Sequence, residues 1–185
     1  MFARVKLDYK IHRFLLKDKF YIDPIDVTPQ CLNSIIGYCL GDNLVMSINS
    51  SNSDINWSLR IGDEINDLIH DRNRYDGRYN TKVIVDYCLE NNINLLEYPP
   101  IFYCLLCGKY DWYLPSIDEL RIFGTYKEIF LRNCLISGVK TNLNNRSIWS
   151  STLVYRGIVN CLTSINDVAW SYPNWNAYTL PFLKI

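Results

Sequence analysis

Apolar and polar residues alternate along several stretches of the chain, which is the pattern of half-buried strands. Val5, Leu7, Tyr9 and Ile11 occupy every second position and predict a strand near the start. Residues 35–48 predict two strands joined by a turn at 41–43. From Trp149 onward, short apolar pieces predict a further series of strands.

Elsewhere the apolar residues recur at the spacing of a helix. Residues 81–91 predict an amphipathic helix, and Asn80 and Thr81 form its start signal. The polar stretches 49–56 and 72–80 predict loops on either side of less regular sequence. Strands and helices together predict an α+β fold.

The sharpest local signal is the run DWYLPSIDEL, residues 111–120. Ser116 followed three residues later by Glu119 is a capping box, in which each side chain bonds the other residue's backbone amide. The box predicts a short helix over 117–123, ending near Gly124.

Asp118 and Glu119 also allow a different interpretation, as an acid/base pair of an enzyme. Neighbouring helical side chains diverge by about 100°, however, so the two carboxylates point apart. Capping already accounts for Glu119, and both acidic residues suit the positive end of a helix dipole. We therefore prefer the capping interpretation.

Composition excludes several classes of protein. The 185 residues carry 19 Lys and Arg against 19 Asp and Glu, without the basic excess of a nucleic-acid binder. Half of the residues are apolar (49%), which excludes intrinsic disorder. No apolar run approaches the ~20 residues that cross a bilayer, so we expect no membrane insertion.

The chain divides into two parts. Residues 1–29 contain many charged residues and two prolines, and they form either an arm, which is a possible attachment segment, or the first strand of the domain. Residues 30–185 form the domain itself.

Seven cysteines are an odd number without disulfide spacing, and most lie among apolar neighbours, so free buried thiols are expected. Cys104 and Cys107 alternatively form half a zinc site or a redox pair. Only His12 and His70 could add imidazole ligands, and there is no second such pair of cysteines. We expect no metal and no cofactor.

The C-terminal region is rich in aromatic and amide side chains and poor in charge. Between residues 160 and 182 the only charged residue is Asp167. Such a mixture is typical either of a hairpin packed into the core or of a recognition surface, because Tyr and Trp provide large contact areas at low entropic cost. The candidate ligand- or partner-binding residues are Trp170, Tyr172, Asn174, Trp175, Asn176 and Tyr178.

The order of several motifs along the chain resembles that of the DUF1566 (Lcl-type) domain. This family is related to the variable proteins of diversity-generating retroelements. The motifs are Asn80-Thr81, DWYLPS..EL, WSST at 149–152 and Ala169-Trp170, and the similarity spans about residues 34–185. The resemblance implies a C-type-lectin-like fold, with two short helices flanking a mostly antiparallel twisted sheet. It implies structural roles for Trp112, Leu114, Pro115, Ser116, Glu119 and Trp149.

The same resemblance implies a non-catalytic binding protein. The Glu-Pro-Asn or Gln-Pro-Asp motif of calcium-dependent lectins does not occur, so no calcium-dependent sugar site is expected. Abundant Ile, Asn, Tyr and Lys indicate AT-rich codons, and no signal peptide is visible. These features favour a phage virion protein of structural or adhesion function, with the bacterial cytoplasm as the alternative location.

The expected partners are other virion proteins in an oligomeric assembly, together with a host surface glycan or protein. The alternative function is an enzyme of the same broad fold, similar to the formylglycine-generating enzymes or otherwise thiol-dependent. A reactive, exposed thiolate at Cys104 or Cys107 would favour it.

Overall fold

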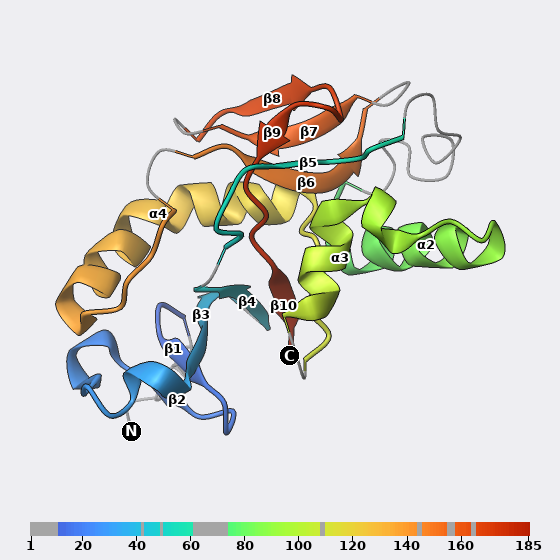
Figure 1. Cartoon of the computed structure of the whole chain (residues 1–185). Helices are drawn as coiled ribbons and strands as arrows, with labels where there is room; N and C mark the ends of the chain where they lie inside the picture. Colours follow the sequence, from blue (N-terminus) through green and yellow to red (C-terminus); the bar gives the residue numbers. More distant parts are fainter. Residues whose placement is uncertain are drawn as a thin grey trace, which may run out of the picture.

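The computed structural model describes residues 11–41, 43–48, 50–60, 74–107, 110–143, 146–154, 158–163 and 166–185. Within these ranges the chain is an α+β protein with three α-helices and antiparallel sheets, as the sequence predicts for its class. Figure 1 shows the three-stranded sheet at one end of the molecule and the β1–β4 strands at the other, with the helices between and beside them. None of the described helices is long and apolar enough to cross a bilayer.

A five-stranded sheet joins the two ends of the chain. Its strand order is β10-β4-β3-β1-β2, and every neighbouring pair is antiparallel. Its strands are β1 (Phe14–Leu16), β2 (Tyr21–Ile22), β3 (Ile35–Gly41), β4 (Leu44–Ser47) and β10 (Phe182–Lys184). The strand pair predicted within 35–48 is confirmed. The strand predicted over 5–11 lies almost wholly outside the described residues, so its structure stays a prediction.

A second, three-stranded sheet has the order β6-β7-β8 and is also antiparallel. It comprises β6 (Ile148–Leu153), β7 (Val159–Leu162) and β8 (Val168–Ser171), which confirms the predicted strands after Trp149. Beside it, β5 (Ile55–Asn56) pairs with β9 (Asn176–Ala177) in a two-stranded ribbon.

The helix α2 (Gly77–Glu90) begins four residues before the predicted start at residue 81. Its N-cap is Asp76, whose carboxylate accepts a hydrogen bond from the Tyr79 amide. The prediction of a loop over residues 72–80 is therefore wrong for residues 77–80, which belong to α2. Asn80 and Thr81 instead lie buried within the helix, where their side chains contact other segments.

The structure corrects the expectation of two short helices. An additional helix, α3 (Pro99–Leu106), forms from the apolar run before the DWYLPS segment. The helix α4 (Ile117–Ser137) has 21 residues and passes through Gly124, ending where Gly138 adopts a left-handed conformation with φ of 72°. A single interior glycine costs only about 1 kcal/mol in a helix. Buried residues recurring along α4 outweigh that cost, among them Leu120, Phe123, Phe130 and Cys134.

Two hydrophobic clusters make up most of the core. The larger lies between α4 and one face of the five-stranded sheet, where Tyr38 packs edge-on against Phe14 and Phe130. The second lies between the three-stranded sheet and the helices α2 and α3, and includes Trp57 and Trp149.

The buried carboxylate of Glu119 holds the junction between these parts. The residue is 5% exposed, and the predicted capping box with Ser116 is confirmed. Glu119 Oε2 accepts hydrogen bonds from the Ser116 amide at 2.8 Å and from the Gly77 amide at 3.1 Å. Glu119 Oε1 accepts from the Tyr113 hydroxyl at 2.9 Å and lies 3.4 Å from Lys184 Nζ. One carboxylate thus connects the starts of α2 and α4 with the final strand.

The DWYLPS segment is bonded to its neighbours through its backbone. The Leu114 amide donates to Thr81 Oγ1 of α2 at 3.0 Å. The Pro115 carbonyl accepts from the Ser151 amide of β6 at 2.7 Å, and the Ile117 amide donates to Thr152 Oγ1 at 3.0 Å. These bonds fix the WSST strand against the start of α4.

The other residues predicted to be structural are also buried. Trp112, Leu114 and Pro115 lie inside the molecule. Trp149 is completely buried, and its indole Nε1 donates to the Ile55 carbonyl at 2.7 Å. These four residues therefore contribute to the packing of the interior.

Replacing Glu119 with alanine should lower the free energy of unfolding by about 3 kcal/mol, because buried amide and hydroxyl donors lose a charged acceptor. Urea unfolding measures the loss. The matched control is Asp86→Ala, which removes an ion pair with Lys82 on the exposed surface of α2 and should leave stability nearly unchanged. Equal losses in the two variants would contradict the structural role of Glu119.

Candidate functional site

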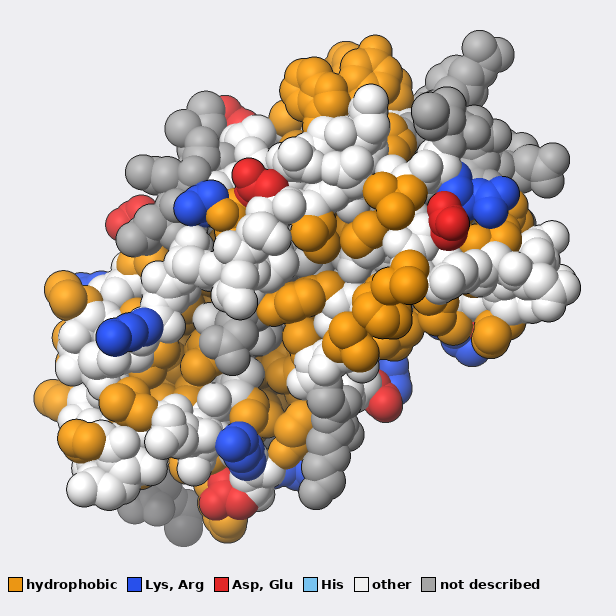
Figure 2. All heavy atoms as spheres, viewed as in Figure 1, with side chains coloured by type: hydrophobic (Ala, Val, Ile, Leu, Met, Phe, Trp, Pro, Cys, Tyr) orange, Lys and Arg blue, Asp and Glu red, His pale blue; other side chains and the backbone are white. Residues whose placement is uncertain are grey.

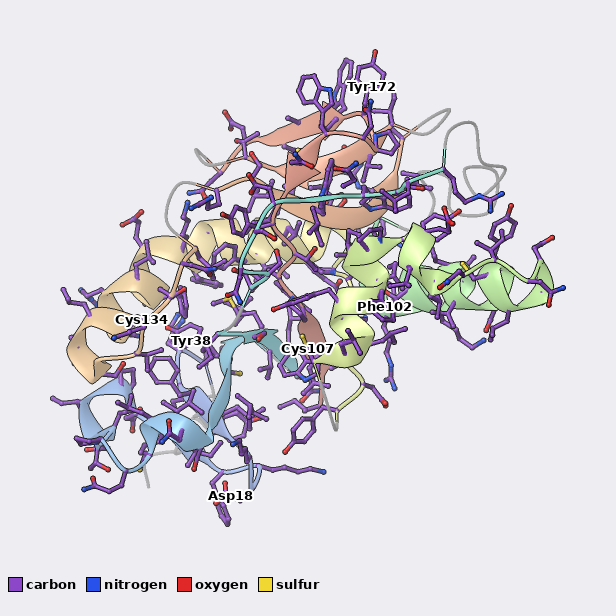
Figure 3. The ribbon with its side chains drawn as sticks, viewed as in Figure 1. Asp18, Tyr38, Phe102, Cys107, Cys134 and Tyr172 are labelled. Carbon is purple, nitrogen blue, oxygen red and sulfur yellow. The ribbon has the colours of Figure 1, made fainter. Side chains whose placement is uncertain are left out.

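Five of the six candidate binding residues lie exposed at one end of the molecule. The exposed fractions of Trp170, Tyr172 and Trp175 are 73%, 60% and 61%, and Asn174 and Asn176 are exposed beside them. These five residues are called the C-terminal aromatic surface below. Figure 2 shows hydrophobic side chains projecting at this end, and Figure 3 shows Tyr172 pointing away from the body of the protein.

The backbone beneath this surface is held in place by hydrogen bonds. The Trp175 amide donates to the Tyr172 carbonyl at 2.9 Å and closes the turn between β8 and β9. The Trp57 amide donates to the Pro173 carbonyl at 2.8 Å, which ties the turn to the segment after β5. The rings of Tyr172 and Trp175 lie 6.2 Å apart with planes inclined by 59°. The two rings are therefore presented together by a fixed turn.

Tyr178 lies apart from the other candidates. It is 5% exposed, and its carbonyl accepts a hydrogen bond from the Trp149 amide at 2.9 Å. The guanidinium of Arg146 covers its ring at 4.3 Å from the centroid. If side chains alternated strictly between the buried and the exposed face of a strand along this stretch, Tyr178 would be exposed together with Trp170 and Asn176. The chain instead turns inward after the two-residue strand β9 to bridge Ile148.

The chemistry of the C-terminal aromatic surface suits binding. From residue 168 to residue 183 the sequence contains no Asp, Glu, Lys or Arg, so the surface offers no charged group of its own. The aromatic rings supply apolar area, and the amides of Asn174 and Asn176 supply hydrogen-bond donors and acceptors. Such a surface combines apolar area with neutral hydrogen-bonding groups.

A cavity of about 690 Å³, which the sequence did not predict, lies between the five-stranded sheet and α3. Its lining includes Tyr103, Cys107, Tyr110 and Trp112, with Lys17 at one side. Burial raises the pKa of the Cys107 thiol and that of the Tyr103 hydroxyl. Both groups therefore hold their protons at neutral pH. The apolar run before DWYLPS is the only sequence signal that could have indicated this cavity.

The described residues that were considered for thiol or metal chemistry lie in apolar or aromatic surroundings. Cys104 is fully buried, and burial raises the pKa of its thiol well above the ordinary value. Burial lowers the pKa of His12, which lies beside the ring of Tyr126. His70 lies outside the described residues. In the part of the chain that the structure describes, no three His, Cys, Asp or Glu side chains are grouped as metal ligands.

Asp118 and Glu119 occupy different environments. Asp118 accepts from Arg74 Nε at 3.2 Å and from Arg121 Nη1 at 2.8 Å near the surface. Glu119 faces the interior and bonds backbone amides, as described above. The acid/base interpretation of the two carboxylates has no support in this geometry.

The buried thiol of Cys134 predicts a loss of stability in alkali. Burial raises the pKa of Cys134 from 9.0 to about 12. Between these values the unfolded chain ionises the thiol while the folded chain keeps its proton, so the free energy of unfolding falls as pH rises above 9. Cys134→Ala should reduce this slope by up to ~1.4 kcal/mol per pH unit, measured by urea unfolding at several pH values.

The control for the alkaline experiment is Leu143→Ala, which removes a buried apolar side chain of the same core cluster. It should lower stability at every pH and leave the slope unchanged, because no ionisable group is lost. A slope that is the same in Cys134→Ala and in the wild-type protein would contradict the prediction.

Comparison with known proteins gives a match at the level of fold. No family model and no curated protein matches the sequence. Among solved structures, the chain is similar to a fimbrial protein from Bacteroides ovatus, with a TM-score of 0.76 and 13% sequence identity. The alignment covers 95% of this chain and 49% of that protein, so the chain spans about half the length of the fimbrial protein. The similarity shows that the two share a fold over nearly the whole of this chain.

Proposed function

We propose that this chain is a non-catalytic binding module of C-type-lectin-like design that takes part in adhesion. It binds a partner protein, or a glycan or protein on a host surface, through the C-terminal aromatic surface. The observation that carries the proposal is the presence of three largely exposed aromatic side chains on one hydrogen-bonded turn region.

Leaving these aromatic side chains in water costs free energy that binding a partner recovers. Exposed apolar groups gathered at one place are typical of an interaction surface. Trp and Tyr provide much contact area with few rotatable bonds, and the fixed turn reduces the ordering needed on binding. Binding through Tyr172 and Trp175 is therefore favoured over a purely structural role for these rings.

The shared fold with a fimbrial protein supports an adhesion role in general terms. The ordered motifs DWYLPS..EL and WSST carry the resemblance to the DUF1566 family, and both lie at the buried junction of α4 and β6. The phage particle as carrier, its other proteins as partners, and attachment through residues 1–29 stay predictions. A screen for proteins that co-purify with the full chain addresses all three.

Substitution of the exposed rings tests the proposal. Tyr172→Ala and Trp175→Ala should each weaken binding at least tenfold, as loss of an aromatic hot spot does, while leaving thermal stability unchanged. Binding is measured with the fluorescently labelled protein on a glycan array and on whole bacterial cells.

The matched control is Phe20→Ala, which removes an aromatic side chain of similar exposure (69%) from the β1–β2 end of the molecule. It should bind as the wild-type protein does. Unchanged binding by both Tyr172→Ala and Trp175→Ala, or an equal loss in Phe20→Ala, would place the binding site elsewhere.

A further inference from the structure

The outer edges of the two larger sheets differ in how they are covered. At β10, Tyr113 exchanges two backbone hydrogen bonds with Phe182, each of 2.9 Å. At β6, the Trp149 amide donates to Tyr178 and the Ser151 amide donates to Pro115. The edge strand β2 has only two residues and lies between charged side chains. Within the described ranges no segment pairs with the outer edge of β8.

The register of β8 on β7 shows which of its backbone groups face outward. The Thr163 amide donates to the Asp167 carbonyl at 2.8 Å, so these opposite residues form a hydrogen-bonded pair. Hydrogen-bonded and non-hydrogen-bonded pairs alternate along an antiparallel ladder. Ala169 and Ser171 therefore bond β7, whereas the amides and carbonyls of Val168 and Trp170 point away from it.

The β8 edge also has none of the usual protection against pairing. Natural edge strands are guarded by lysine, proline, bulges or extreme shortness. The sequence of β8 is Val-Ala-Trp-Ser, its register with β7 is regular, and the nearest charge is Asp167. Its central aromatic side chain, Trp170, is 73% exposed.

We propose that two copies of this chain associate through antiparallel pairing of their β8 strands. With the two-fold axis at Ala169, Val168 of each copy lies opposite Trp170 of the other. Each such pair exchanges two hydrogen bonds between the outward amides and carbonyls. The two three-stranded sheets then form one continuous sheet.

Side-chain chemistry favours a second copy as the occupant of this edge. A two-fold axis places the same residues opposite each other, so a charged edge would repel itself, whereas β8 carries no charge. Val168 and Trp170 project from the same face of the sheet, because they are two residues apart. The exposed indole of each copy therefore covers the half-buried Val168 of the other, an aromatic and β-branched pair of the kind that stabilises antiparallel strands.

This association uses Trp170 of the C-terminal aromatic surface and leaves the exposed rings of Tyr172 and Trp175 for ligand binding. Tyr172 and Trp175 lie just beyond β8, so the dimer places these rings of the two copies on either side of the same two-fold axis. Two sites held together bind a multivalent surface more strongly than one.

Sedimentation equilibrium of the full chain tests the proposal, together with two variants. Val168→Pro removes an outward amide at the first residue of the strand, where proline leaves the β7 ladder intact. Trp170→Lys replaces the covering indole with a charge. Each should raise the dimer dissociation constant at least tenfold, while the nuclear magnetic resonance signals of the buried Trp57 and Trp149 indole N–H groups stay in place.

Trp175→Ala is the matched control, since it removes an exposed indole outside β8. It should remain dimeric while losing ligand binding, which separates failure of this proposal from failure of the proposed function. A wild-type protein that stays monomeric up to ~1 mM, or a dimer that survives both β8 variants, overturns the proposal.

Amide hydrogen exchange in the wild-type protein gives a second test that needs no folded variant. Protection of the Val168 and Trp170 amides should rise with protein concentration, whereas the Ala169 and Ser171 amides are protected at every concentration by β7. Exchange of Val168 and Trp170 that is independent of concentration overturns strand pairing at this edge.

Discussion

The need to satisfy one buried carboxylate determines how the parts of this protein meet. Glu119 is almost completely enclosed, and an enclosed charge without donors is severely destabilising. Its donors come from the starts of α2 and α4, from Tyr113 and from Lys184 near the chain end. These segments are therefore brought to a single point, although they are far apart in the sequence.

A second ion pair extends this junction toward the surface. Lys184 Nζ lies 2.8 Å from Asp76, the residue that caps α2. Burial opposes charge on both groups, yet their hydrogen bond raises the pKa of Lys184 and lowers that of Asp76. The final strand, the cap of α2 and the cap of α4 thus share one charged network. The turn at residues 172–175 is held separately, by the β5–β9 ribbon and by backbone hydrogen bonds. The rings of Tyr172 and Trp175 therefore need not pack into the core to fix this turn.

The features that sequence reasoning identified correctly depend on local chemistry. The capping box of Ser116 and Glu119 involves residues three apart, so its geometry follows from the helix start alone. The predicted end of α4 near Gly124 was wrong. A glycine resembles a helix stop signal, but the packing of Phe123 and Phe130 in the core stabilises the helix beyond that residue. The inward position of Tyr178 was missed for a similar reason, since it depends on a bridge to Ile148, thirty residues earlier. The donors of Glu119 from α2 and β10 could not be predicted, because no local pattern records them.

The five tryptophans report directly on whether this protein binds through its C-terminal aromatic surface. Trp57 and Trp149 are buried and hydrogen-bonded, Trp112 lines the cavity beside α3, and Trp170 and Trp175 are exposed at the opposite end. The decisive measurement is the nuclear magnetic resonance spectrum of the five indole N–H groups during titration with a glycan or protein that the chain binds. We predict that the Trp175 signal shifts while those of Trp57, Trp112 and Trp149 stay in place. A shift of the Trp112 signal, with that of Trp175 unmoved, would contradict this prediction and place binding in the cavity.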